Sequence, residues 1–523
     1  MRPILKFDNP LFNKNEISEY LKTDARLMRL ASSIMKLPSG YKHVIYAKDV
    51  SYAKIVCSIL ILLGYEHCYD SNHNYKHNNI TQRRFAYLSQ SNVYQKPLSR
   101  KLVKEIKKIY NARPSNIYGK DIQIVVIDHH FKEGIDFFDV RYLHIYSDLR
   151  STQDEKQIVG RAKRMCGHIG LYPDTKLYVY NYFTRPLQDN TLANELTKIC
   201  YYASVDFPTD DINSAQEIAK NLFIGDIFDT IKSNISEEDD IYSQYKKIHL
   251  GGDNFQQFRK EISLFAMKYK QLNTVNDMKT LCTSNTFNMS YTQKFIKDYF
   301  TPTNSAKGML LWHSAGSGKT CTGLGVARTF ADKGYTIIWV TKASLLPDIK
   351  KNLMDCYGKD TIDRKRWLVP MSYRTFTNML QRNNKYYEEL VSKNKTDLRK
   401  TLLIIDEAHK LFDNSLSRQE RPDINTLKQI IRLQSSCRLL LMTATPFMKN
   451  HMDLIKLLNL ILPDSNILPT DFEQFSNTFL MKDNIHFTEE GAKMFIEIVH
   501  RHISYLDISS DITKFAQEIK ISV

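Results

Sequence analysis

Short runs of apolar and aromatic residues recur in two parts of this chain and predict buried β-strands. In the first part they occupy 43–47, 122–128, 142–146 and 176–182, and in the second 308–312, 335–341, 402–406 and 438–444. Helix-prone segments separate the runs in both parts. Strands that alternate with helices are typical of a parallel sheet covered on both faces. The pattern therefore predicts two α/β domains.

The stretch between these two parts has a different composition. Residues 191–285 are largely polar and helix-prone, and an acidic cluster occupies 237–240. We expect a helical accessory or connecting region there. Beyond position 450, leucines at helical spacing predict an amphipathic helix that leads out of the second domain. The predicted divisions are an α/β domain over 1–190, the accessory region over 191–285, a second α/β domain over 286–465 and an extension over 466–523.

The size and charge of the chain agree with two domains and favour a polyanionic partner. With 523 residues, the chain is too long for one hydrophobic core. Its formal net charge of +16 favours a nucleic acid as partner. A coding bias towards lysine and asparagine would explain the same excess equally well. Charge alone does not distinguish DNA from RNA.

Cysteine placement and hydropathy bear on where the protein acts. None of the eight cysteines forms a Cys-x-x-Cys pair, which gives a zinc site little support. Scattered cysteines without a signal sequence are typical of a reducing compartment. The longest apolar stretch, 55–63, is too short to span a bilayer. We therefore expect a soluble, cytoplasmic protein that does not associate with membranes.

A glycine-rich loop after the predicted strand at 308–312 indicates an ATP site. Small residues let successive backbone N–H groups turn inward around phosphate oxygens, and the following helix N-terminus adds favourable partial charge. Lys319 would contact the β- and γ-phosphates, and Thr320 would coordinate Mg²⁺. One departure is His313, where the strict pattern has glycine. The predicted nucleotide-binding residues of the loop are Ser314, Ala315, Gly316, Ser317, Gly318, Lys319 and Thr320.

The motif Asp406-Glu407-Ala408-His409 ends another predicted strand, about 80 residues further on. Carboxylates at the C-terminal end of a buried parallel strand lie at the ligand edge of the sheet. Asp406 would hold Mg²⁺ together with Thr320. Glu407 would orient and deprotonate the attacking water. His409 would sense the γ-phosphate and relay its state toward bound nucleic acid.

Two further segments fit around this predicted site. Thr443-Ala444-Thr445-Pro446 follows the strand at 438–442, and its hydroxyls could hydrogen-bond the acidic motif. The alternative is an ordinary exit from strand to turn. Gln293 lies upstream of the phosphate loop, and its amide could recognise the adenine edge. A solvated helix residue is an equally good interpretation of Gln293.

An arginine motif of the form Gln-x-x-Gly-Arg-x-x-Arg lies about 150 residues before the phosphate loop, and its residues are Gln157, Gly160, Arg161 and Arg164. Phosphoryl transfer needs positive charge at the γ-phosphate, which an arginine from a facing domain supplies when a cleft closes. A spacing of three puts both arginines on one helix face. The alternative is a solvated basic helix. Upstream, Asp136 follows a predicted tight turn and could anchor a loop between the ATP site and bound nucleic acid.

Several segments are candidates for contacts with a nucleic-acid backbone. Lys342-Ala343-Ser344 follows a predicted strand, and Tyr373, Arg374 and Thr375 follow the segment 369–371 at a comparable sheet edge. Hydroxyls, amides and basic side chains there would hold phosphate and sugar without recognising sequence. The stretch 99–110 carries five basic residues at helical spacing, and a solvated helix face is the simpler interpretation of that stripe.

Together, the phosphate loop, the Asp-Glu-Ala-His motif, Thr443-Ala444-Thr445 and the arginine motif resemble superfamily-2 helicases and translocases. More narrowly, the chain resembles the helicase-like ATPases of large cytoplasmic DNA viruses and linear cytoplasmic plasmids. That group includes the small subunit of the poxvirus early transcription factor and the poxvirus nucleoside triphosphate phosphohydrolase I. The segment 111–128 is especially similar. The resemblance implies two RecA-like lobes, ATP with Mg²⁺, and a nucleic-acid partner, with DNA favoured over RNA.

The order of the motifs departs from that family. There the lobe with the phosphate loop comes first, whereas here the arginine motif leads. Residues 501–506 resemble the family's entry into its second lobe, yet the sequence stops soon after. We expect a circular permutation in which 485–523 packs onto 1–190, because a fold survives rearrangement where its termini are neighbours. The alternative is a helical appendage beside a lobe that is complete within 1–190.

These features predict a nucleic-acid-dependent ATPase that acts as a helicase or translocase in viral or plasmid transcription. RNA polymerase or other transcription proteins would be its further partners. The alternative is a promoter-binding transcription-factor subunit that uses ATP as a conformational switch without unwinding. The motifs do not separate unwinding from translocation.

Overall fold

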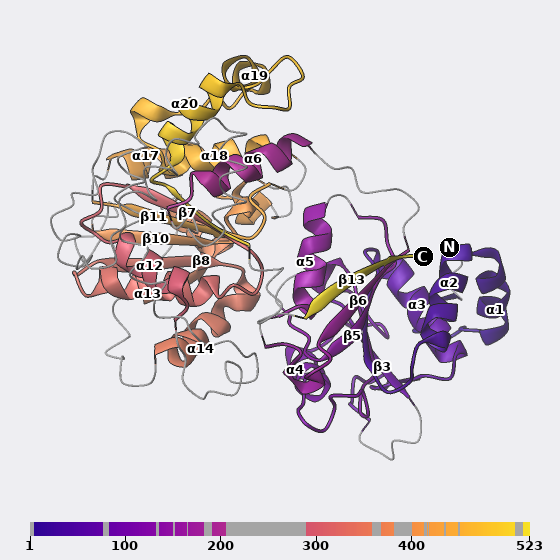
Figure 1. The fold of residues 1–523 in the computed structure, drawn as a ribbon. Helices are drawn as coiled ribbons and strands as arrows, with labels where there is room; N and C mark the ends of the chain where they lie inside the picture. Colours follow the sequence, from indigo (N-terminus) through magenta and orange to yellow (C-terminus); the bar gives the residue numbers. More distant parts are fainter. Residues whose placement is uncertain are drawn as a thin grey trace. The chain divides into compact units, whose positions relative to one another are not determined.

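The computed structural model contains two compact units, each built around one parallel sheet (Figure 1). The N-terminal unit comprises the described residues within 1–188 and 508–523, and the P-loop unit comprises those within 189–507. The part of the predicted accessory region from 206 to 285 lies outside the described residues. The structure describes residues 5–76, 83–131, 135–149, 152–164, 166–182, 191–205, 289–357, 368–380, 400–412, 416, 418–433, 436–447, 450–507 and 516–523.

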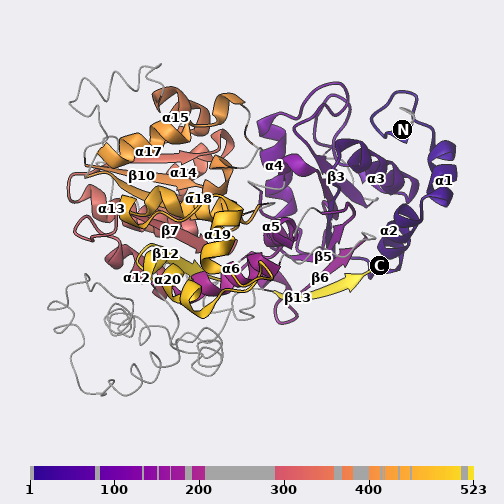
Figure 2. The same ribbon diagram turned by 90° about the horizontal axis from the view of Figure 1, so that it is seen from above.

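The sheet of the N-terminal unit has the strand order β13-β6-β5-β1-β4-β3-β2, with parallel pairing throughout. The chain's last strand, β13, lies beside β6, with Gln517 opposite Lys176 and Ser522 opposite Asn181 (Figure 2). Every residue of the central strand β1 is buried, as expected for a sheet covered on both faces. The strands are β1 Lys42–Tyr46, β2 Glu66–His67, β3 Arg84–Leu88, β4 Ile124–Ile127, β5 Val140–Ile145, β6 Lys176–Asn181 and β13 Gln517–Ser522.

Helices cover both faces of this sheet, with α4 and α5 on one side and α2 and α3 on the other (Figures 1 and 2). Helix α4 buries every fourth residue, Leu102, Ile106 and Tyr110, which leaves its basic residues on the outer side. Side chains of Asp24 and Ser99 cap α2 and α4 by accepting backbone N–H bonds. The helices are α1 Lys14–Thr23, α2 Ala25–Lys36, α3 Val50–Leu62, α4 Arg100–Tyr110 and α5 Thr152–Ala162, with short 3-10 turns η2 His129–Phe131 and η3 Ile169–Leu171.

The sheet of the P-loop unit has the strand order β12-β7-β11-β10-β8-β9 and is also parallel throughout. The strands that precede the phosphate loop, the threonine motif and the acidic motif are the neighbours β7, β11 and β10. All three motifs therefore leave the same edge of the sheet at adjacent positions. The strands are β7 Gly308–His313, β8 Thr336–Thr341, β9 Leu368–Ser372, β10 Thr401–Asp406, β11 Arg438–Thr443 and β12 Ile503–Leu506.

Two layers of helices cover the P-loop sheet, with α12 and α13 on one face and α17 and α18 on the other (Figure 1). Each layer buries apolar side chains in its own hydrophobic cluster with the strands. The helices are α6 Thr191–Tyr202, α12 Tyr291–Tyr299, α13 Lys319–Ala331, α14 Leu346–Tyr357, α15 Tyr373–Leu380, α17 Ile424–Leu433, α18 Met452–Ile461, α19 Phe472–Phe479 and α20 Glu489–Val499, with 3-10 turns η4 Ala343–Leu345, η6 Ala408–Leu411, η7 Arg418–Glu420 and η8 Asp464–Asn466.

The predicted extension over 466–523 is divided between the two units, which corrects its assignment as a whole to the N-terminal unit. Helices α19 and α20 bury Phe475, Phe479 and Phe495 in the core of the P-loop unit, because these rings complete the apolar cover that α18 begins. Strand β12 pairs with β7 of the same unit, and α6 packs against α20 and β12. Of the described residues in the extension, those from 516 to 523 join the N-terminal sheet.

The predicted fold class, two parallel-sheet α/β lobes with helices, is confirmed. Each of the eight predicted strands matches an observed strand within a few residues, namely β1, β4, β5, β6, β7, β8, β10 and β11. The leucine-rich segment beyond 450 forms α18, whose described residues are almost all buried. Across the part of the chain that the structure describes, no helix is both long and apolar enough to cross a bilayer.

Candidate nucleotide site and arginine motif

The phosphate loop joins β7 to α13 and has the backbone of an anion-binding turn. Gly316 and Gly318 have φ values of 83° and 82°, in the left-handed region that glycine adopts without strain. Helix α13 begins at Lys319, so its first N–H groups open toward the loop. The predicted loop residues thus occupy a strand–loop–helix junction, which is the setting that phosphate binding requires.

Two side chains of the loop fit a phosphate group. The Lys319 ammonium donates to the carbonyls of His313 and Ser314, at 2.9 and 3.2 Å, so it lies over the loop itself. The hydroxyl of Ser317 is buried and has no hydrogen-bond partner among the residues that the structure describes. A buried polar atom of this kind is usually satisfied by a ligand or by water. The lysine and the serine hydroxyl together suit the oxygens of a nucleotide phosphate.

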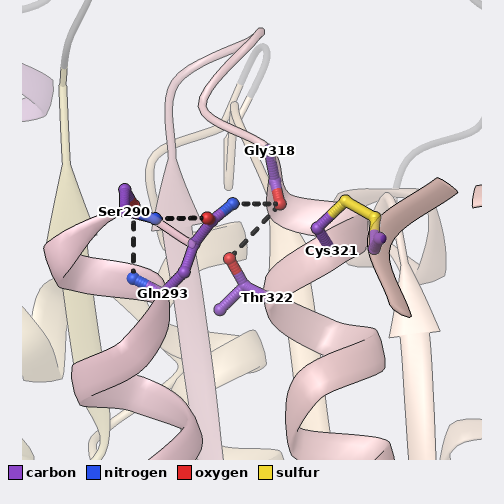
Figure 3. The surroundings of a disulfide bond; sticks show 6 residues. Ser290, Gln293, Gly318, Cys321 and Thr322 are labelled. Atoms are coloured by element: carbon purple, nitrogen blue, oxygen red, sulfur yellow. Dashed lines mark hydrogen bonds between the residues drawn. A yellow bond between two sulfur atoms is a disulfide. The ribbon is translucent and has the colours of Figure 1, made fainter. Parts of the chain in front are cut away.

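Gln293, predicted to recognise adenine, is held close to the phosphate loop (Figure 3). Its side-chain oxygen accepts from the Ser290 backbone N–H at 2.8 Å, which completes a capping box at the start of α12. Its amide nitrogen donates to the Gly318 carbonyl at 3.2 Å. A Cβ at position 318 would collide with this amide. The glutamine therefore ties α12 to the loop, and its contact with adenine stays a prediction.

The Asp406 carboxylate lies at the end of β10, where it is buried and next to a second carboxylate. Burial and the neighbouring Glu407 carboxylate raise the pKa of Asp406 to about 7, and the nearby Lys319 ammonium opposes the rise. Its Oδ2 accepts a hydrogen bond from Thr341 Oγ1 at 3.1 Å. A divalent cation would stabilise the ionised form of such a group. The Asp406 carboxylate therefore fits Mg²⁺, and the role of Thr320 as a second ligand stays a prediction.

Glu407 has an unusual backbone for a residue with a side chain. Its φ and ψ of 54° and 49° lie in the left-handed region, where a non-glycine residue costs about 1 kcal/mol or more. The hydroxyl of Tyr373 donates to the backbone carbonyls of Asp406 and Glu407, at 2.8 and 3.2 Å. The Glu407 side chain is 20% exposed, so it can reach water. The turn is thus held by a buried tyrosine and presents its carboxylate at the sheet edge.

The acidic motif and the threonine motif are joined by a direct contact. His409 is buried in η6, and its Nδ1 lies 2.9 Å from Thr443 Oγ1 at the end of β11. The same hydroxyl accepts from the Thr445 backbone N–H at 3.0 Å. Glu407 Oε2 lies 3.6 Å from His409 Nδ1. A short chain of contacts therefore runs from the acidic motif to the threonine motif.

His313, at the position where the strict pattern has glycine, belongs to the packing of the sheet. Its Nε2 lies 2.7 Å from Ser504 Oγ of β12, which is the strand beside β7. Burial lowers the pKa of His313 to about 3, so the imidazole is neutral at physiological pH. The departure from the pattern is accommodated because a hydroxyl of the neighbouring strand satisfies the ring.

The arginine motif lies in the N-terminal unit on and just after α5. Gln157 is buried in the helix. Arg164 lies beyond the helix end at Ala162, yet both arginines reach one carboxylate: Asp136 Oδ1 is 2.7 Å from Arg164 Nε and 3.6 Å from Arg161 Nη1. Burial alone would raise the pKa of Asp136, but the charges of Arg164 and Arg161 hold it below its ordinary value. Asp136 is thus the partner of both predicted finger arginines.

A second ion pair holds the loop that follows these arginines. Arg113 contacts the buried Asp139 through Nε at 2.6 Å and Nη2 at 2.9 Å. It also donates to the Gly167 carbonyl at 2.7 Å, and the Gly170 N–H donates to Asp139 Oδ1 at 3.0 Å. The segment that resembles the viral ATPases therefore supports the backbone next to the arginine motif.

The candidates for nucleic-acid contacts differ in whether their side chains are exposed. Tyr373 was expected at a contact surface, but it is 1% exposed and its hydroxyl serves the acidic motif, because α15 turns the ring inward. This corrects that expectation. Arg374 is exposed, and Thr375 hydrogen-bonds Ser372. Lys342 follows β8 at the same sheet edge as the nucleotide site. The basic side chains of α4 are mainly exposed.

Sequence reasoning missed Thr341, Ser504 and the inward role of Tyr373. Thr341 ends β8 and Tyr373 begins the helix after β9, so both lie at the C-terminal edge where ligands bind. The available signal was a polar residue at the end of a buried strand or directly after it. Such a residue could have been predicted to hydrogen-bond the acidic motif. Ser504 gave no such signal, because its relation to His313 depends on which strand joins β7.

The comparisons with known proteins agree with this geometry. A family model described as type III restriction enzyme, res subunit, matches residues 264–448. The "Putative ATP-dependent RNA helicase R563" of Acanthamoeba polyphaga mimivirus is 27% identical over 287 residues, covering 50% of this chain and 48% of that protein. Nucleoside triphosphatase I of Choristoneura fumiferana entomopoxvirus is 28% identical over 192 residues, covering 35% of this chain and 28% of that protein.

A further relative is the termination factor NPH-I homolog of African swine fever virus, 26% identical over 182 residues, with 34% of this chain and 25% of that protein covered. The match thus spans about half the length of the mimivirus protein and about a quarter of the other two. Two parallel-sheet lobes, a phosphate loop beside an Asp-Glu-Ala-His motif, and these relatives together support a superfamily-2 helicase, similar to the helicases and nucleoside triphosphatases of large DNA viruses.

Proposed function

We propose that this chain is a nucleic-acid-dependent ATPase that acts as a helicase or translocase. The observation that carries the proposal is the meeting of three motifs at one sheet edge: the phosphate loop after β7, the threonine motif after β11 and the acidic motif after β10. A site of this kind binds a nucleoside triphosphate and activates water beside its γ-phosphate.

In this proposal, the residues of the P-loop unit divide the work of hydrolysis. The loop N–H groups and Lys319 bind the phosphates of ATP. Thr320 and Asp406 hold Mg²⁺, which supplies positive charge next to the phosphate oxygens. Glu407 orients the attacking water and accepts its proton, and its partly exposed carboxylate supports that role. His409 and Thr443 transmit the state of the site along their hydrogen bond.

The N-terminal unit would complete the site with positive charge. Arg161 and Arg164 are proposed to neutralise the γ-phosphate in the transition state, as arginine fingers do. Their shared ion pair with Asp136 supports this role, because it keeps the two guanidinium groups close to one carboxylate. Gln157, buried in α5 one turn before Arg161, would keep that helix in place.

We further propose a nucleic-acid partner and a biological setting for this chain. The net charge of +16 and the exposed basic face of α4 support a nucleic acid, with DNA favoured over RNA. Two relatives are named as a termination factor homolog and a nucleoside triphosphatase, which supports a role beside RNA polymerase in viral or plasmid transcription in the cytoplasm. The chain would then couple ATP turnover to movement along a template.

We also propose that the order of the two lobes is permuted relative to the family. The arginine motif precedes the phosphate loop in the sequence. The pairing of β13 with β6 supports the idea, since the last residues of the chain add an edge strand to the sheet that its first residues build.

The test is ATP turnover titrated with single-stranded DNA, duplex DNA and RNA, followed by a strand-displacement assay. The proposal expects stimulation by at least one polymer, and loss of turnover in Lys319→Ala and in Arg164→Ala. Arg26→Ala is the matched control for Arg164→Ala, because Arg26 pairs with Asp148 on the surface of the same unit at 3.5 Å. Turnover that no polymer stimulates, together with nucleotide-dependent DNA affinity, would support a promoter-binding switch instead.

A further inference from the structure

The phosphate-loop helix carries a cysteine pair that the proposed ATP chemistry does not use. Cys321 lies in the first turn of α13, directly after Lys319 and Thr320, and Cys356 lies in the last turn of α14. Their sulfurs form a disulfide between Cα atoms 6.0 Å apart (Figure 3). That separation falls within the range of about 4.4–6.8 Å that a disulfide bridges. The two helices that flank β8 are therefore covalently joined beside the nucleotide site.

This pair differs from four other cysteines of the chain, which are free and buried: Cys57, Cys68, Cys200 and Cys437. Burial raises the pKa of each of these thiols, to about 12 for Cys437, so little of their thiolate forms at neutral pH. Since the thiolate is the reactive form, these four residues resist oxidation. Cys321, by contrast, is only partly buried.

The geometry of the pair also favours its reaction. Cys356 is 8% exposed and lies within bonding reach, so it can resolve an intermediate formed on Cys321. Accessibility and a resolving partner therefore occur together at this pair.

We propose that Cys321 and Cys356 form a reversible redox modification site, whose oxidation weakens the stimulation of ATP turnover by nucleic acid. The regulatory half of this inference rests on the proposed function. Intracellular disulfides are usually transient and redox-sensing, which agrees with a cysteine pair in a protein expected to act in a reducing compartment.

The chemistry is thiol–disulfide exchange with a low-molecular-weight disulfide such as oxidised glutathione. The Cys321 thiolate attacks one glutathione sulfur, which forms a mixed disulfide and releases one glutathione thiolate. The Cys356 thiolate then attacks the Cys321 sulfur, which forms the protein disulfide and releases the second glutathione. Overall, two cysteine thiols are oxidised to one disulfide, and one oxidised glutathione is reduced to two thiols.

The effect on stimulation follows from what the disulfide encloses. The two cysteines are 35 residues apart, and the segment between them contains β8, Lys342 and η4. Lys342 is a candidate contact to the nucleic-acid backbone, and Thr320 precedes Cys321. A covalent bond between α13 and α14 restrains the segment around Lys342 from moving relative to the nucleotide site at Thr320. The oxidised form would therefore bind nucleotide, because the phosphate loop keeps its turn, but would respond less to nucleic acid.

The experiment uses the full chain in oxidised and in reduced glutathione buffers. Differential alkylation followed by mass spectrometry measures the disulfide, and ATP turnover is measured with and without single-stranded DNA. We expect the disulfide in the oxidising buffer, a stimulated turnover lower by about fivefold, and a nucleotide Kd changed by less than about twofold. Cys321→Ser and Cys356→Ser should match the reduced wild type in both buffers. Cys437→Ala, a matched control in the same unit, should respond like the wild type.

Three outcomes decide between the possibilities, with thermal melts confirming that each variant folds. Absence of the disulfide in the oxidising buffer, or equal stimulation with and without it, overturns the inference. Loss of stimulation on oxidation that persists in both serine variants overturns it as well. If the reduced wild type hydrolyses no ATP under any condition, the proposed function fails, while the alkylation measurement still decides whether the modification site exists.

Discussion

The imidazole Nδ1 of His409 lies 2.9 Å from the hydroxyl of Thr443, which connects the acidic motif to the threonine motif. Both groups are buried, so no solvent competes for the bond. Thr443→Val removes the hydroxyl with little change in shape. We expect the stimulation of ATP turnover by nucleic acid to fall about tenfold, the factor that corresponds to 1.4 kcal/mol, with ATP affinity unchanged. Steady-state kinetics with and without DNA measures this.

The control for Thr443→Val is Thr377→Ala, which removes another buried hydroxyl of the same unit, one that donates to a backbone carbonyl of α15. It should lower the Tm without changing the stimulation ratio. An equal loss of stimulation in both variants would show that the effect reflects general destabilisation rather than communication between the motifs.

Asp406 carries a second prediction, which concerns pH. Its carboxyl has a pKa of about 7 in the folded chain, raised by burial and by Glu407, against an ordinary value of 3.8. Above about pH 7 the group is ionised in the folded and unfolded chain, and the folded state bears the cost of burying the charge. As the pH falls through 7, the folded chain binds a proton that the unfolded chain does not, so the contribution of this group to stability rises.

Asp406→Asn should therefore stabilise the P-loop unit at pH 8, and the gain should shrink towards pH 5. A gain of about 1 kcal/mol corresponds to roughly 2–4 °C in the Tm. Thermal unfolding without nucleotide or Mg²⁺ at the two pH values measures it. Asp332→Asn, which removes a surface partner of Arg328, is the control and should show no such trend. A lower Tm for Asp406→Asn at pH 8 would contradict the prediction.

Much of this architecture could be predicted from the sequence, because buried parallel strands are continuous apolar runs. The runs at 308–312 and 402–406 identified β7 and β10, and the motifs at the ends of these strands form the candidate site. β3 and β9 were missed: β3 begins with a charged residue, and β9 contains Pro370. β13 was missed as well, because it is an edge strand of mixed polarity.

Contacts between side chains that are distant in the sequence could not be predicted from the sequence. The bond between Ser504 and His313 depends on the choice of β12 as neighbour of β7, which no local pattern encodes. The pairing of Arg164 with Asp136 could not be foreseen from helical spacing either, since α5 ends at Ala162 and Arg164 reaches the carboxylate from the following turn. Spacing placed both arginines on one helix face, which is wrong for Arg164, although the two side chains share the Asp136 carboxylate.

Asp136 provides a third prediction. Asp136→Asn keeps the shape of the side chain but removes the charge that holds Arg161 and Arg164. We expect kcat to fall by about tenfold, because the guanidinium groups lose their common anchor, while the Kd for ATP stays the same. Asp148→Asn, which removes the surface partner of Arg26, should leave both constants unchanged. A higher kcat would mean instead that Asp136 restrains the arginines from reaching the nucleotide.

The last prediction concerns β13, the strand that the end of the chain adds to the N-terminal sheet. Its six residues pair with β6 in parallel. Glu155 of α5 and Lys163, directly after that helix, form ion pairs with Lys520 and Glu518 at 3.0 and 3.1 Å. A chain that stops after Asp507 loses this strand and exposes the edge of β6. We expect the unfolding transition of the N-terminal unit to drop by about 5 °C or more, with nucleotide binding in the P-loop unit retained.

The matched control separates strand pairing from charge. Replacing both Glu518 and Lys520 by glutamine keeps the strand and removes its ion pairs. The pair of the exposed Lys520 with Glu155 contributes less than about 1 kcal/mol. This variant should unfold within about 3 °C of the wild type. If it unfolds as early as the truncated chain, the ion pairs rather than the added strand hold the sheet edge. If neither variant shifts the transition, β13 does not complete the N-terminal sheet in solution, and the proposal of a permuted lobe order loses its structural support.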